Sequence, residues 1–98
     1  MSIQSNVTPL RNAARDLRRA RGEFVEALIK ADDRSNRYVA LQIGLNPTSM
    51  GERLRGKSPF LADELENIAR VLKMDPIDFY SRYISVTADG TDPRTLVP

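Results

Sequence analysis

Residues 36–57, NRYVALQIGLNPTSMGERLRGK, contain two short helical patterns separated by a turn signal. Val39, Ala40 and Ile43 fall on one face of a helix of about two turns, and the hydroxyl of Ser35 before it can cap its first turn. Gly44 follows, and glycine readily adopts the left-handed conformation in which a helix ends and the chain reverses. The pattern therefore predicts a short first helix that ends at this glycine.

The second half of the stretch predicts another helix, from about Pro47 to Arg55. Asn46 can cap its first turn. Pro47 suits the first helical position, because the N–H that proline lacks would have no partner within the helix there. Met50 and Leu54 are four residues apart and form its inner face. The outer face carries the polar residues Thr48, Ser49, Glu52, Arg53 and Arg55.

Composition restricts the possible classes of protein. A chain of 98 residues with 41% hydrophobic residues is long enough for one domain with its own core. It has no cysteine and no histidine, which removes disulfide frameworks, thiolate metal sites and the most common general base. The adjacent pair Asp32 and Asp33 has no third ligand nearby in the sequence. We expect a protein that is not an enzyme and that holds no cofactor or metal.

Charge is distributed unevenly along the chain. Residues 1–57 carry 11 Lys/Arg against 6 Asp/Glu, whereas residues 58–98 carry 4 against 7. This asymmetry is either a chance imbalance on a solvated surface or the positive half that nucleic-acid binding requires. No apolar run approaches the ~18 residues of a membrane span, and MSIQSNVTP lacks a signal pattern, so we expect a cytoplasmic protein without a membrane partner.

A long helix is predicted before the central stretch. Apolar residues keep helical spacing from Leu10 to Ile29, with no change of phase at Gly22, which favours one helix from Pro9 to about Ala31 over two that meet at the glycine. Its first half carries five arginines: Arg11, Arg15, Arg18, Arg19 and Arg21. They could contact phosphates, flank a dimer stripe of Leu10, Ala14 and Leu17, or form a solvated face paired with Asp16.

Two further helices are predicted after the central stretch. One runs from Leu61 or Ala62 to Lys73, and the other begins at the cap-and-proline pair Asp75-Pro76. We expect the apolar residues of this last helix to cover the core: Ile77, Phe79, Tyr80 and Tyr83. The whole organisation is then a flexible N-terminus (1–8), a helical domain (9–84) and a mobile tail (85–98).

Residues 36–56 resemble the helix-turn-helix of lambda-repressor-like regulators, the Cro and Xre type. The pattern of that family is matched by a small residue, two glycines and two apolar residues: Ala40, Gly44, Leu45, Met50 and Gly56. The likeness continues over roughly Arg21 to Tyr83. It implies an all-α, compact five-helix domain, here with an extended N-terminal helix.

The resemblance also implies which residues meet DNA. Base contacts are expected from Pro47, Thr48 and Glu52, and the short hydroxyl side chain of Ser49 suits the same role. Gly51 would let the backbone approach the groove wall. Thr48 and Ser49 could instead cap the first turn, and Glu52 could instead pair with a neighbouring arginine. Contacts to phosphate or base edges are expected from Asn36, Arg37, Arg53, Arg55 and Lys57.

These expectations describe a sequence-specific double-stranded DNA-binding transcriptional regulator from a phage or a bacterium. Repression by blocking polymerase is its simplest mechanism, because no effector or activation domain is evident. Binding as a homodimer, at least on DNA, is expected since one small helix reads few bases. Two alternatives stay open: a protein–protein interaction module that uses the same fold without DNA, and a DNA-bending excision or architectural factor.

Overall fold

A computed structural model describes residues 10–88, with side chains from residue 13 onward. This part of the chain is all-helical and compact, and it contains no strand. The expected flexible N-terminus, the expected helix start at Pro9 and residues 89–98 of the expected tail lie outside the described residues. The five helices are α1 (Leu10–Ala31), α2 (Asn36–Gln42), α3 (Pro47–Leu54), α4 (Ala62–Val71) and α5 (Pro76–Ser85).

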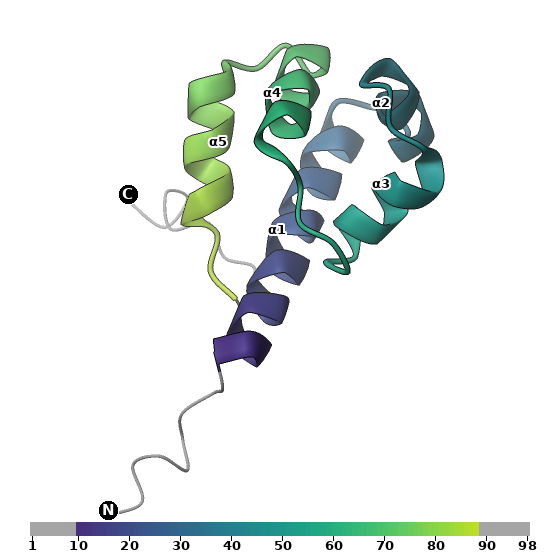
Figure 1. Cartoon of the computed structure of the whole chain (residues 1–98). Coiled ribbons are helices and arrows are strands. Elements are labelled where there is room, and N and C mark those ends of the chain that lie inside the picture. The colour runs from purple at the N-terminus through teal and green to yellow at the C-terminus, as the bar shows by residue number, and fades with distance from the viewer. Residues whose placement is uncertain (1–9, 89–98) are drawn as a thin grey trace, which may run out of the picture.

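α1 contacts α2, α3 and α5 (Figure 1). α2 and α3 lie on one side of α1 and contact each other, while α4 and α5 pair on the other side. α2 also contacts α4, which joins the two sides. Val39 and Ala40 of α2 and Met50 and Leu54 of α3 are buried as predicted, and each helix contributes to one continuous core. The largest fully buried side chains are Phe79, Ile29, Met50, Ile68, Val25 and Val39.

Three helices begin at the caps that the sequence predicts. The Ser35 hydroxyl accepts a hydrogen bond from the Tyr38 amide at 3.0 Å. The Asn46 side chain accepts one from the Thr48 amide at 2.7 Å, and α5 starts in the same way at Asp75. Each cap satisfies a backbone N–H that has no partner within its helix, which fixes where the helix starts.

Four helices end in one common way, with a residue in the left-handed conformation and a bond from the next amide back over the last turn. After α2, for example, the Leu45 amide donates to the Ala40 carbonyl at 2.8 Å. The left-handed residues are Asp33, Gly44, Gly56 and Lys73. Only the two glycines were predictable as helix stops. Because Lys73 itself takes this conformation, α4 ends at Val71, two residues before its predicted end.

α1 is one helix through Gly22, as predicted, and this glycine has a packing role. A Cβ at Gly22 would overlap the Leu54 carbonyl oxygen at the end of α3, and one at Gly56 would lie 2.6 Å from the Arg19 Cα. α1 and the end of α3 therefore meet through their backbones. The contact fixes how α3 is presented by the rest of the fold.

The prediction that all four apolar residues of the last helix cover the core was wrong for two of them. Phe79 and Tyr83 are buried, but Ile77 and Tyr80 are 80% and 46% exposed. They lie on a neighbouring side of α5, at the groove toward α4, because a ten-residue helix buries only one of its faces. The helix also continues to Ser85, and Val86 is buried, so folded chain extends past the expected boundary at residue 84.

Candidate functional site

The outer face of α3 presents short polar side chains. Thr48 is exposed, and Pro47, Ser49 and Glu52 are half-buried. Among the described residues, neither the Thr48 hydroxyl nor the Glu52 carboxylate has a hydrogen-bond or ion-pair partner. Asn46 supplies the cap of this helix, so the alternative in which Thr48 or Ser49 does so is not seen. The outer face thus keeps a free hydroxyl and a free carboxylate.

Arg53 is turned toward α4 and does not pair with Glu52. Its Nε donates to Glu64 Oε1 at 2.7 Å, and its Nη1 donates to the Ser49 carbonyl at 3.4 Å. The same Glu64 oxygen accepts the Leu61 amide at 2.9 Å, so one carboxylate caps α4 and joins it to α3. The Arg53 side chain is only 17% exposed. Glu64 was missed from sequence because no local rule connects residues 11 apart across a loop.

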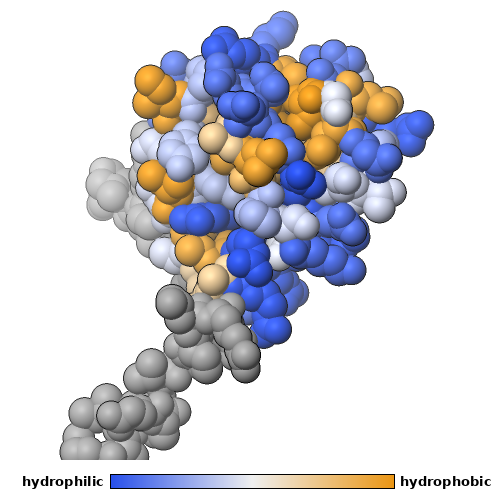
Figure 2. Space-filling model, viewed as in Figure 1, coloured by the Kyte–Doolittle hydropathy of each residue, from blue (hydrophilic) through white to orange (hydrophobic). Residues whose placement is uncertain are grey.

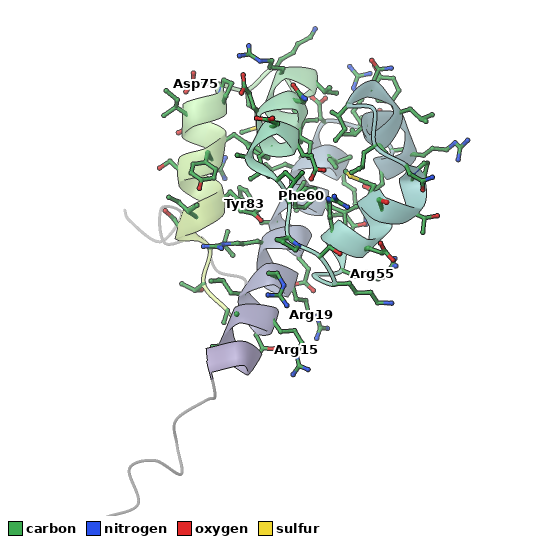
Figure 3. All side chains as sticks on the ribbon, in the orientation of Figure 1. Arg15, Arg19, Arg55, Phe60, Asp75 and Tyr83 are labelled. Carbon is green, nitrogen blue, oxygen red and sulfur yellow. The ribbon has the colours of Figure 1, made fainter. Side chains whose placement is uncertain are left out.

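Arg55 and Lys57 are the exposed cations at the end of α3. Neither forms an ion pair within the described part of the chain. The Arg55 guanidinium lies back along the helix, with Nη1 3.0 Å from the position that a Cβ at Gly51 would take. Figure 3 shows Arg55 at the lower end of α3, on the side that faces Arg19 and Arg15 of α1.

The two residues predicted at the start of α2 differ from each other. The Asn36 side-chain amide donates to Glu26 Oε2 at 2.7 Å, which ties α2 to α1, and its Oδ1 is buried without a partner. Arg37 is exposed and has no polar partner among residues 10–88. Asn36 is thus occupied in joining α2 to α1, whereas Arg37 presents its charge to solvent.

The arginines of α1 divide into two groups. Arg21 is half-buried: it donates to the Ile84 carbonyl at 3.3 Å and lies over the Tyr83 ring, 5.3 Å from its centroid. Arg18 donates to the Gly56 carbonyl at 3.4 Å. The other described arginines, Arg15 and Arg19, form exposed ion pairs with Asp16 and Glu23.

The expected dimer stripe on α1 is only partly visible. Ala14 and Leu17 are half-buried, while the side chains of Leu10 and Arg11 lie outside the described residues. Farther along α1, Ala20 is buried beside residues 86–88, which run next to this helix (Figure 1). Residues 86–88 therefore cover part of this face of α1.

A second surface lies between α4 and α5. A groove of about 620 Å³ is lined by apolar side chains that include Leu65, Ile77 and Tyr80, with Glu66 and Arg70 at its polar side. Figure 2 shows hydrophobic patches on the side of the molecule where α5 lies. The groove is separate from the outer face of α3.

Groups that could hold a metal are absent among residues 10–88, and no helix there has the length and apolar character to cross a membrane. No family model, curated protein or solved structure matches the chain. The function proposed below therefore rests on the geometry of the described residues.

Proposed function

We propose that this chain is a sequence-specific double-stranded DNA-binding regulator of the lambda-repressor-like type. α3 would lie in the major groove, which is wide enough to admit one α-helix. The observation that carries the proposal is the outer face of α3, where Thr48 and Glu52 keep their hydrogen-bonding groups free of partners among residues 10–88. Free polar groups on a rigidly packed helix are what base-edge recognition needs.

Residues of this face and the cations near it have distinct chemical roles in the proposed complex. Glu52 would accept a hydrogen bond from a cytosine amino group, and Thr48 would use its hydroxyl or methyl group. Pro47 would make an apolar contact, for example with a thymine methyl. Arg37, Arg55 and Lys57, the exposed cations named above, would bind phosphates.

Arg53 and Asn36 take a smaller part in the proposed complex. Their polar groups already bind Glu64 and Glu26. They would hold α3 and α2 in position relative to the neighbouring helices. We further propose that the regulator is a repressor that blocks polymerase, and that it binds as a homodimer to half-sites about one helical turn, ~34 Å, apart.

Enrichment of duplexes from a random pool tests this function. The wild-type chain should enrich one motif. Glu52→Gln should change the preferred base at one position from cytosine toward adenine, because an amide can pair bidentately with adenine, with a discrimination of about 1–3 kcal/mol. Glu66→Gln, a matched change in α4, should leave the motif unchanged. Failure to enrich any sequence, or the same motif from the Glu52→Gln variant, would refute sequence-specific reading by α3.

A protein-interaction module is the second candidate, and the groove between α4 and α5 favours it. Ile77 is 80% exposed at this groove, and Leu61 nearby is 58% exposed. Exposed apolar side chains around a groove are typical of surfaces that bind protein. If this candidate is correct, Ile77→Asp abolishes capture of the partner and substitutions on α3 do not.

A further inference from the structure

Basic residues from two distant parts of the sequence meet where α1 passes the end of α3. A surface hollow of about 350 Å³ is lined by side chains of α1 and of the loop after α3. We call this group of cations the basic corner. Its members are Arg15, Arg18, Arg19, Arg55 and Lys57.

The backbone fixes the basic corner in place. Gly56 lies against Arg19, close enough that a Cβ would be only 2.6 Å from its Cα, and the Arg18 Nε donates to the Gly56 carbonyl at 3.4 Å. The loop that carries Arg55 and Lys57 is therefore held on α1. Arg15 and Arg19 follow one turn apart, about 6 Å along the helix axis. Figure 3 shows Arg55, Arg19 and Arg15 following one another down the same side of the molecule.

The corner keeps an excess of positive charge that can be used for binding. Two carboxylates, Asp16 and Glu23, reach Arg15 and Arg19 at 3.9 and 3.7 Å. These four side chains are between 53% and 73% exposed. Ion pairs as exposed as these contribute little and are screened by salt, so a polyanion can displace them.

The position of the corner relative to α3 indicates its partner. α3 has eight residues, so it is about 12 Å long, similar to the ~12 Å width of the major groove. Groups at its C-terminal end would then lie over one wall of the groove, which is a phosphate backbone. Arg55 caps that end, and the α1 arginines continue the charge outward from it.

We infer that the basic corner is a second DNA-contacting surface, which binds the phosphodiester backbone beside the groove that α3 occupies. This inference rests on the proposed function. It gives the extension of α1 a role: the extension would enlarge the contact with one strand's backbone, add no base reading, and raise affinity equally for all sequences.

The test is the salt dependence of duplex binding, measured by fluorescence anisotropy with the full chain. Each neutralised phosphate contributes about −0.9 to the slope of log K against log salt. Arg15→Ala/Arg19→Ala should make the slope shallower by about 1.8 and weaken binding of specific and random duplexes by the same factor. Both side chains are largely exposed, so thermal unfolding should be unchanged.

The matched control is Arg70→Ala/Lys73→Asn, which removes two charges at the end of α4. Asparagine tolerates the left-handed conformation of Lys73. This control should keep the parent slope. If Arg15→Ala/Arg19→Ala also keeps the parent slope, or if the slope of the control becomes shallower by as much, the basic corner is not a phosphate site. Binding through α3 still stands in either case. If the wild-type chain binds no duplex even at low salt, both proposals are overturned.

Discussion

At the scale of single residues, two helical glycines in this chain have opposite surroundings. Gly22 lies against the backbone of Leu54, whereas Gly51 faces only the flexible end of the Arg55 side chain. Glycine in a helix is normally less stable than alanine by about 0.5–1 kcal/mol. The same substitution should therefore have opposite effects at the two positions.

Gly22→Ala should destabilise the fold by about 1–3 kcal/mol, because a new methyl group must push α3 away from α1. Gly51→Ala should be neutral or stabilise by up to about 1 kcal/mol. Urea denaturation of both variants measures the difference. A stabilised Gly22→Ala variant would mean that α3 does not cross α1 at this glycine.

The buried phenol of Tyr83 makes stability depend on alkaline pH. Burial raises the pKa of Tyr83 above its ordinary value of 10.0, and Tyr80 adds to the increase, while Arg21 acts in the opposite direction. Above pH 10 the unfolded state loses this proton first, so the folded state binds more protons and the free energy of unfolding falls as pH rises.

Tyr83→Phe should remove this contribution. As pH rises from neutral to the highest pH at which both chains are still folded, the free energy of unfolding should fall less for the variant than for the parent. Thermal unfolding of both chains at several pH values above 9 checks it, with Tyr38→Phe, a change at an exposed tyrosine of α2, as the control. Parallel curves for parent and Tyr83→Phe would contradict the buried position of this side chain.

At the scale of elements, the join between α3 and α4 depends on the pair of Arg53 and Glu64. Arg53→Met should destabilise by about 1–3 kcal/mol, because it leaves a largely buried carboxylate without its charged donor. Arg55→Met, a matched change two residues later, should stay within ~0.5 kcal/mol because Arg55 is exposed.

The salt dependence of DNA binding should change in Arg55→Met and not in Arg53→Met, the reverse of the effects on stability. Arg55→Met should make the salt slope shallower by about 0.9. Arg53→Met, measured where it is still folded, should keep the parent slope. If Arg53→Met has a shallower salt slope and unchanged stability, Arg53 turns outward to phosphate and does not join α3 to α4.

At the scale of the whole molecule, local rules predicted most of the fold. The helix starts at Asn36, Pro47 and Pro76 follow from cap residues, because a cap depends only on its immediate neighbours. The single long helix through Gly22 follows from an unbroken apolar period. Helix ends were less predictable where Asp33 and Lys73 take a conformation that usually belongs to glycine.

What could not be predicted depends on contacts between distant parts of the chain. The apolar residues of α5 form two stripes, and helical spacing alone does not indicate whether Phe79 and Tyr83 or Ile77 and Tyr80 face the core. For the candidate site, the sequence indicated the outer face of α3. It gave no signal for the partner of Arg53, since Glu64 is brought to it only by packing.

The most direct test of the central claim is nuclear magnetic resonance of the nitrogen-15-labelled chain, titrated with a duplex of about 20 base pairs, two helical turns. We predict the largest changes of amide chemical shift at Arg37 and across residues 48–55, with the amides of Ile77 and Tyr80 unmoved. Changes confined to the groove between α4 and α5, or none at all at low salt, would contradict DNA binding through α3.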